Sequence, residues 1–375
     1  MTKLAGPVML LPDISKDATA IEDLLTRFND YGLEVFKKSD GKTQILNIVA
    51  AGFPDNFLKA NFSKYPYLKI KVLSNNRIIF LIQLRKLVFE NRKVISMLIA
   101  GDPWLGYLWS LIATFGLEIP IQVSIHGEPY LPINYLRSIK PFLKHVWLRC
   151  FLNFADSIRL VSEHQMESII NVYQIDSSKI SIAPIPVKIP DGKIMAKEYD
   201  RIVAFVGRLH SERGINLWIE VIGHLYTKRQ DFSVVIVGDG PERESFLNRL
   251  NSSCSGLSFE FLGRITHDEV AKLWRNISVL LSTAHTESYG LTLREAQMSG
   301  TFVVAFENEG TRSNSSLFPK GMALFTTIEQ AAEAISSNLD SHISPSRQLE
   351  FRRIQKALNL SSMNNLISSW RLPKY

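Results

Sequence analysis

Two glutamates, Glu287 and Glu295, are separated by seven residues and flank the step Gly290-Leu291-Thr292. This step follows an apolar, β-rich run and opens a helical pattern. A helix that begins near Leu291 would present the backbone N–H groups of these three residues to an anion. One carboxylate could then accept two hydrogen bonds from a ribose diol, while the other lies beside a sugar ring. The alternative is a pair of unrelated surface glutamates.

Two earlier turns contain the residue types that bind phosphate. Gly207, Arg208 and Arg213 lie between a β-rich run and a helical pattern. Glycine permits close approach of the backbone, and guanidiniums bind phosphate oxygens in pairs of hydrogen bonds. The second turn, 238–241, reads Gly-Asp-Gly-Pro, but Arg243 occupies the third glycine position of a dinucleotide fingerprint. A Rossmann dehydrogenase is therefore disfavoured. Taken alone, the two arginines of the first turn would more often be solvated loop residues.

Short β-rich runs alternate with helical patterns along the chain, which is typical of βαβ units and parallel sheets. The expected strands are 44–51, 68–73, 94–100, 121–125, 157–161, 202–206, 233–237, 259–262, 279–282 and 302–305. Ligands bind at the carboxyl ends of such strands, where the turns described above lie. The connection 182–193 contains three prolines and is expected to be a stiff linker between two domains.

The composition limits the class of protein. Of 375 residues, 46% are apolar and 21% are charged, which excludes a disordered chain and a polytopic membrane protein. The longest apolar stretch, 103–117, is shorter than the roughly 20 residues that cross a bilayer and is expected to be a buried helix. We find no signal-peptide pattern, so we expect a cytoplasmic protein. Cys150 and Cys254 have no metal-ligand spacing, and no metal site is expected.

A net charge of +7 indicates an anionic partner, such as nucleotide phosphates or an anionic membrane surface. Motifs for nucleic-acid binding are absent, so nucleic acid is not an expected partner. Arg137, Lys140, Lys144 and Arg149 occur among large apolar residues between 134 and 154. A helix there would offer a basic, aromatic face to anionic lipid headgroups or to a lipid-phosphate acceptor. The alternative is a core helix with solvated lysines.

The order and spacing of these motifs resemble the retaining GT-B glycosyltransferases of family 4, the glycosyl transferases group 1. The resemblance runs from about 201 to 335. It includes the two glutamates, the turn at 207–214, the turn at 238–241, the segment Phe261-Leu262-Gly263 and the segment 300–305.

The resemblance implies roles for individual residues. Gly207, Arg208 and Arg213 would hold the donor diphosphate together with Gly290, Leu291 and Thr292 at the helix start. Glu295 would bind the ribose. Glu287 would lie near the transferred sugar and its phosphate and is, with His126, a predicted catalytic residue.

In the N-terminal half, the step His126-Gly127-Glu128 is similar to a strand end of the family whose histidine lies close to the donor sugar. A lone histidine is also often structural, so both interpretations of His126 stay open. Two positions depart from the family. Arg213 replaces a lysine, and the stretch 12–17 replaces a glycine-rich loop.

The resemblance therefore predicts a GT-B fold, with two Rossmann-like domains facing across a cleft. An acceptor-side domain would comprise 1–190, a nucleotide-sugar-binding domain 191–340, and C-terminal helices at 341–375 would return to the first domain. The implied enzyme transfers a sugar, with retention, from a UDP- or GDP-sugar to a glycan or lipid-linked acceptor in cell-envelope polysaccharide or lipopolysaccharide synthesis. No cofactor or metal is expected. The protein would be cytoplasmic. A further hypothesis is that it attaches peripherally to the inner face of the plasma membrane.

Two alternatives from other classes remain. A nucleotide-sugar epimerase of the same architecture would use the same diphosphate site without an acceptor. A non-catalytic nucleotide-sugar-binding protein would keep the fold and turn over nothing.

Overall fold

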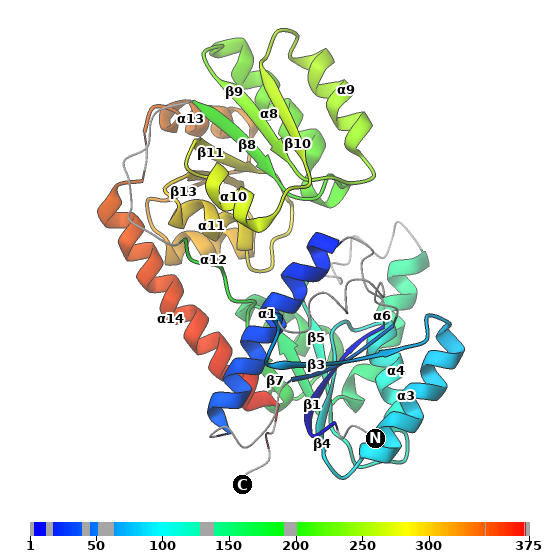
Figure 1. The fold of residues 1–375 in the computed structure, drawn as a ribbon. Helices are drawn as coiled ribbons and strands as arrows, with labels where there is room; N and C mark the ends of the chain where they lie inside the picture. Colours follow the sequence, from blue (N-terminus) through cyan, green and yellow to red (C-terminus); the bar gives the residue numbers. More distant parts are fainter. Residues whose placement is uncertain are drawn as a thin grey trace. The chain divides into compact units, whose positions relative to one another are not determined.

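The computed structural model describes residues 4–12, 18–39, 46–51, 64–127, 139–190, 201–341, 343–370 and 372. The chain divides into two compact units. The first comprises Met1–Pro184 and Leu360–Tyr375, and the second comprises Ile185–Asn359. Each unit has one parallel β-sheet with helices on both faces (Figure 1).

The first unit is built on a seven-stranded sheet of order β3-β2-β1-β4-β5-β6-β7. Its strands are β1 (Gly6–Leu11), β2 (Leu46–Ala51), β3 (Leu68–Leu73), β4 (Ile95–Ala100), β5 (Ile121–Ile125), β6 (Ser157–Leu160) and β7 (Ile180–Ile182). Its helices are α1 (Ala18–Lys38), α3 (Arg77–Asn91), α4 (Leu105–Thr114), α6 (Ile139–Phe151), η2 (Leu152–Phe154), α7 (Glu163–Tyr173) and η3 (Ser177–Lys179).

Alternation along the strands supplies two cores, because successive side chains of a strand point to opposite faces. Met9 of β1 packs with α1 and with Trp370, which follows the last helix. Its neighbours Val8 and Leu10 pack instead with α3 and α4. The sheet therefore has α1 on one face, whereas α3 and α4 cover the other (Figure 1).

The second unit has a six-stranded sheet of order β10-β9-β8-β11-β12-β13. Its strands are β8 (Ile202–Val206), β9 (Ser233–Val237), β10 (Phe259–Gly263), β11 (Ile277–Ser282), β12 (Phe302–Phe306) and β13 (Met322–Phe325). Its helices are η4 (Ser211–Arg213), α8 (Ile215–Lys228), α9 (Arg243–Ser253), α10 (His267–Leu273), α11 (Leu291–Met298), α12 (Glu309–Leu317) and α13 (Ile328–Asn338). Helix α14 (Pro345–Ser369) begins in this unit and ends in the first.

All ten predicted strands are present, with ends that differ by at most two residues. Strands β1, β7 and β13 were not among the predicted runs. The predicted helix within 103–117 is α4, but the expectation that it is buried holds for one side only. Ile112 and Phe115 are 41% and 80% exposed. No helix among the described residues has the length and apolar character needed to span a bilayer.

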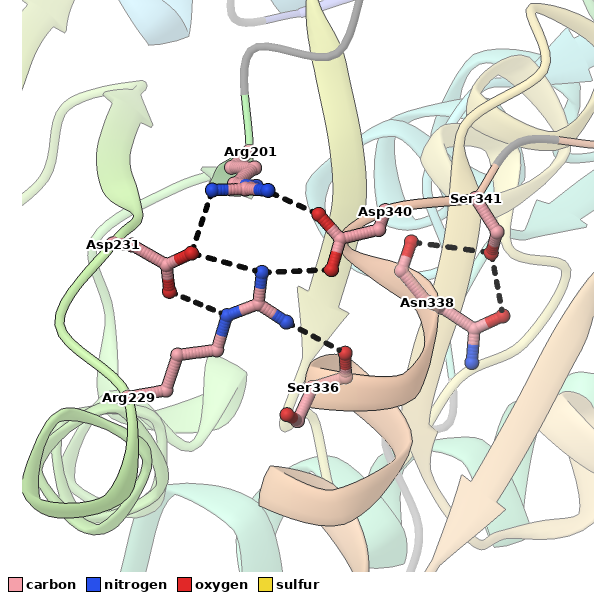
Figure 2. Close-up of polar contacts among 7 residues, drawn as sticks. All are labelled: Arg201, Arg229, Asp231, Ser336, Asn338, Asp340 and Ser341. Atoms are coloured by element: carbon pink, nitrogen blue, oxygen red, sulfur yellow. Dashed lines mark hydrogen bonds and ion pairs between the residues drawn. The ribbon is translucent and has the colours of Figure 1, made fainter.

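Four charged side chains form a closed network at the amino-terminal edge of the second sheet (Figure 2). Arg201, which precedes β8, binds Asp231 and Asp340 at 2.6 Å each. Arg229 binds the same two carboxylates at 2.6 and 2.8 Å. The network thereby ties the entry to β8 and the loop before β9 to the end of α13. It lies at the edge opposite to the turns that contain the predicted site.

Candidate active site

The predicted donor residues of the second unit gather at one point of its sheet. Strand β8 has β9 on one side and β11 on the other, so the chain order reverses between β8 and β11. Ligands of open parallel sheets bind at such a switch point, outside the carboxyl ends of the strands. A pocket occurs at this point. Its lining includes Phe205, Val206, Arg213, Leu281, Ser282, Thr283, Glu287, Thr292 and Leu293.

The turn after β8 is interlocked with the turn after β9 through their backbones. The N–H of Gly207 donates to Val237 O at 3.0 Å, and the N–H of Leu209 donates to Asp239 O at 3.1 Å. A Cβ atom at position 238 would lie 1.8 Å from Gly207 O, and the φ of Gly238 is +125°. Glycine is therefore required at 238, because a side chain would separate the two turns.

Thr283, at the end of β11, fixes the arginine turn. Its hydroxyl lies 3.0 Å from Arg213 O and 2.9 Å from Gly214 O, and donates to these carbonyls. Gly214 begins α8 with a φ of +63°, and a Cβ there would lie 2.0 Å from Thr283 O. The backbone that bears the Arg213 side chain is thus held against the strand that leads to Glu287.

The structure brings Arg213 and Glu287 together. Arg213 Nη1 lies 3.3 Å from Glu287 Oε2, and the other carboxylate oxygen accepts from the N–H of Gly290 at 3.1 Å. The expectation that the Gly290 N–H is free for an anion is therefore wrong, because a carboxylate of the same loop already occupies it. Leu291 and Thr292 form the first turn of α11, whose N-cap, Gly290, has a φ of +73° and no side-chain cap. Thr292 also lines the pocket.

Arg208 is more exposed than Arg213. Its side chain is 63% exposed and forms an ion pair with Glu212 at 3.6 Å, within the turn itself. Arg208 is not among the residues that line the pocket. In this structure, then, Arg213 is the guanidinium at the pocket and Arg208 points to the solvent-exposed part of the same turn.

Glu295 lies one turn inside α11 and is half-buried. Desolvation raises the pKa of its carboxyl group to about 7, and the positive charge of Lys188 opposes this rise. Desolvation dominates because the charged carboxylate loses water that a single cation does not replace. Glu295 therefore changes charge close to neutral pH.

Sequence reasoning missed Arg294, a buried cation next to Glu295. Arg294 is 3% exposed, and its Nε donates to the carbonyl of Tyr289 at 3.0 Å. Its guanidinium lies over the Tyr289 ring, 4.0 Å from the centroid. Gln355 of α14 accepts from Arg294 Nη1 at 3.1 Å and donates to Asn359 at 2.8 Å. Asn359 in turn binds both backbone groups of Val187.

This network is continuous within the second unit. It leads from the loop that bears Glu287, through Arg294 and Gln355, to the segment that precedes the domain's first strand. The partners are 61 residues apart in sequence, so no local pattern indicates them. The available signal in the sequence was a cation next to Glu295, a predicted site residue.

His126 belongs to the first unit, directly after β5, and is exposed. In its neutral form, the imidazole can donate one hydrogen bond and accept another. The carbonyl of Gly127 accepts from Gln165 of α7 at 2.8 Å, which holds the strand end in place. Glu128 lies outside the described residues.

Comparison with known proteins gives a match to a family model. Residues 191–353 match the model of the family described as Glycosyl transferases group 1. The matched residues lie within the second unit, which is therefore similar to glycosyl transferases group 1. Among curated proteins, the chain is similar to a 2-deoxystreptamine glucosyltransferase of Streptomyces kanamyceticus, with 25% identity over 221 residues. That match covers 54% of this chain and 57% of the relative, so the chain matches a little over half the length of that protein.

Solved structures extend the likeness to the whole fold. A TarM mutant from S. aureus, in complex with Fondaparinux, alpha-GlcNAc-glycerol and UDP, has a TM-score of 0.73 at 13% identity, over 97% of this chain and 99% of that chain. Anabaena Alr3699/HepE in complex with UDP-glucose has a TM-score of 0.69 at 14% identity, over 97% and 100%. The two parallel-sheet domains of this chain therefore have the GT-B fold that the sequence predicts.

Proposed function

We propose that this protein transfers a sugar from a nucleotide-diphosphate sugar to a glycan or lipid-linked acceptor, with retention at the anomeric carbon. The observation that carries the proposal is the placement of Arg213, Glu287 and the first turn of α11 around one pocket at the switch point. A guanidinium and a helix N-terminus are complementary to a diphosphate, and the adjacent carboxylate is complementary to sugar hydroxyls. UDP is our first candidate for the nucleotide, because two structures of the same fold hold UDP or UDP-glucose.

The Arg213–Glu287 pair does not have to break when the donor binds. A guanidinium has five N–H donors, and Glu287 uses a single guanidinium nitrogen, Nη1. The remaining donors are available for phosphate oxygens, and Arg213 is 44% exposed. Glu287 is held by the Gly290 N–H, so its position relative to α11 is fixed before the donor arrives. Glu295 would accept hydrogen bonds from the ribose hydroxyls in its ionised form.

In the proposed reaction the acceptor hydroxyl attacks the anomeric carbon on the face from which the diphosphate departs. The bond from that carbon to the phosphate oxygen breaks, and the proton of the acceptor passes to the departing phosphate. Arg213 and the N-terminus of α11 stabilise the negative charge that develops on the diphosphate. Neutral His126 would serve as a hydrogen-bonding group toward the donor sugar. No metal is part of this scheme, and we expect transfer to continue in EDTA. A role in cell-envelope glycan synthesis is part of the proposal.

The test measures binding of UDP and of uridine by calorimetry. Arg213→Ala should weaken UDP roughly 10- to 100-fold, the scale of a hydrogen bond to a charged group, and should leave uridine nearly unchanged. Arg275→Ala is the matched control, because Arg275 is also exposed but precedes β11, at the opposite end of the strand. Equal losses for UDP and uridine would remove Arg213 from the diphosphate site.

Turnover distinguishes the proposal from its alternatives. Incubation of the donor alone, in EDTA, should leave the sugar unaltered, and addition of an acceptor should release nucleoside diphosphate. An epimerase would alter the donor without an acceptor. A non-catalytic binding protein would bind UDP and release nothing under either condition.

A further inference from the structure

The outward face of α3 is apolar. Ile78, Ile82 and Phe89 are 73%, 64% and 49% exposed, and their spacing places them on one side of the helix. Phe80 and Leu84 lie on the other side and are fully buried. A helix that covers a sheet ordinarily presents polar residues to water. Here, large apolar side chains occupy both sides of α3.

The same feature recurs on the two helices that follow. On α4 and directly after it, Ile112 and Phe115 are 41% and 80% exposed. On α6, the exposed apolar residues are Ile139 (72%), Phe142 (51%), Leu143 (57%) and Val146 (41%). These residues lie opposite Leu148, which is fully buried in the core.

The three helices form one layer on a single face of the first sheet (Figure 1). Arg85 of α3 donates to the carbonyl of Ala113 in α4 at 2.7 Å. Tyr107 of α4 donates to the carbonyl of Phe151 in α6 at 2.7 Å, and Trp147 donates to Pro103 O at 3.1 Å. The exposed apolar residues therefore share the outer side of this layer. We call them the apolar face: Ile78, Ile82, Phe89, Ile112, Phe115, Ile139, Phe142, Leu143 and Val146.

Two of the four cations in the predicted basic stretch 134–154 can be described in the structure. Lys144 lies over the Trp104 ring, 4.5 Å from its centroid, and Arg149 donates to Val172 O at 2.9 Å. Both are bound within the unit. Arg137 and the side chain of Lys140 lie outside the described residues. Among the described side chains of α6, two exposed cations with partners in the first unit thus accompany four large exposed apolar residues.

Exposed cations instead accompany α3. Arg77, Lys86, Arg92 and Lys93 lie on this helix or directly after it, against a single acidic residue, Glu90. The guanidinium of Arg92 stacks on Phe89, 4.2 Å from the ring centroid. Lys86 is spaced so that it lies on the same side of the helix as Ile82 and Phe89, and its Nζ lies 4.0 Å from Glu90 Oε1. Lys93 follows the end of the helix.

We propose that the apolar face docks onto an anionic lipid bilayer, with its Ile, Phe, Leu and Val side chains in the headgroup boundary and the α3 cations on lipid phosphates. Surfaces that combine large apolar residues with Lys and Arg bind the membrane interface in this way. A second copy of the chain fits less well, because a symmetric contact would place the α3 cations of both copies against one another. This proposal does not rest on the proposed function, since membrane binding requires neither donor nor acceptor.

Co-sedimentation of the full chain with vesicles tests the proposal. Vesicles of phosphatidylglycerol and phosphatidylcholine should bind the wild type more strongly than vesicles of phosphatidylcholine alone. Part of the binding should survive high salt, because apolar contacts are not screened. Ile78→Gln/Ile82→Gln/Phe115→Gln should lower the partition coefficient by roughly tenfold or more at either salt concentration. Lys86→Gln/Lys93→Gln should lower binding only to the anionic vesicles.

The matched control is Leu349→Gln/Leu360→Gln on α14, whose leucines are 49% and 64% exposed but lie on another element. It should bind vesicles like the wild type. All these residues are exposed, so circular dichroism and the melting temperature should stay unchanged. The proposal is overturned if the wild type remains in the supernatant with both vesicles, or if the triple variant sediments equally well. A concentration-dependent dimer that Ile82→Gln abolishes, without vesicle binding, would assign the face to self-association instead.

Discussion

Gln355→Leu should loosen the start of α11, although position 355 lies 60 residues beyond Glu295 in the sequence. Gln355 is fully buried and accepts a hydrogen bond from Arg294 Nη1. Arg294 binds the carbonyl of Tyr289, in the loop between Glu287 and the helix. Removal of the amide therefore leaves a buried guanidinium without one of its acceptors, next to the predicted donor loop.

The magnitude follows from the burial of both partners. A hydrogen bond to a charged group contributes about 1.5–3 kcal/mol. Arg294 is 3% exposed, so water cannot readily replace the lost acceptor. Leucine and glutamine are similar in volume, so the cavity contribution is small. We expect the free energy of local opening of 287–298 to fall by about 2 kcal/mol, which corresponds to roughly 30-fold faster hydrogen exchange.

Hydrogen exchange by mass spectrometry resolves this effect, because it reports on each segment of the full chain separately. Peptides from 287–298 should lose protection, whereas peptides from α4, in the other unit, serve as the internal control. A double-mutant cycle identifies the cause. In an Arg294→Leu background the charge is gone, so Gln355→Leu should cost much less than in the wild type.

Two results would refute this reasoning. If α11 keeps its protection in Gln355→Leu, the hydrogen bond does not stabilise the loop. If Gln355→Leu costs the same with and without Arg294, the loss comes from packing of α14 rather than from the buried charge.

Three further predictions concern the second unit. Burial raises the pKa of Glu295 to about 7, so its stabilising contribution is fully present below pH 4.5 and is lost as the pH rises to about 7. Glu295→Gln should therefore raise the free energy of unfolding at pH 8 by at most about 3 kcal/mol, with a higher melting temperature. At pH 4 the substitution should change the melting temperature little. The Arg229 side chain lowers the pKa of Asp231 and Asp340, so the network stabilises the fold above their ordinary pKa and is lost in acid. Arg229→Ala should thus lower the melting temperature at pH 7 and have no effect at pH 2; an equal effect at both would assign the loss to packing. Gly238→Ala should lower the melting temperature strongly, whereas the control Gly127→Ala, whose Cβ would meet no atom within 4 Å, should not.

The sheets could be predicted from the sequence because buried parallel strands are short apolar runs bounded by turns. Strands β8 and β9 consist mainly of Val, Ile and other apolar residues, and their predicted bounds match the structure. Strand β13, Met-Ala-Leu-Phe, was missed because a four-residue run without β-branched residues resembles any buried segment. The positions of the candidate residues could likewise be predicted, since the turns after strands are where the chain must reverse its direction.

The partners of these residues could not be predicted, because they depend on contacts between distant segments. From the sequence, Lys144 is interpreted as a solvated or membrane-facing cation. Only the fold shows that it lies over Trp104, 40 residues earlier in the chain. The sequence alone does not distinguish Arg294 from the other polar residues of α11. The two residues 294 and 295 are adjacent, yet helical geometry turns their side chains about 100° apart. One of them is buried against α14 and the other is half-buried with a pKa near neutrality.

Arg213 shows why the identity of a cation matters once its neighbours are known. The resemblance to family 4 leads to a lysine at this position. A lysine ammonium is a compact point charge, so in this turn Glu287 and a donor phosphate would share one nitrogen. The guanidinium of Arg213 instead places Nη1 on Glu287 and keeps its remaining N–H groups in a fixed plane. Because Glu287 is itself tied to Gly290, that plane is oriented by the head of α11, the same element that would carry the diphosphate. In the proposed site, the arginine would therefore couple the carboxylate and the diphosphate through one rigid group, whereas a lysine would do so through a single nitrogen.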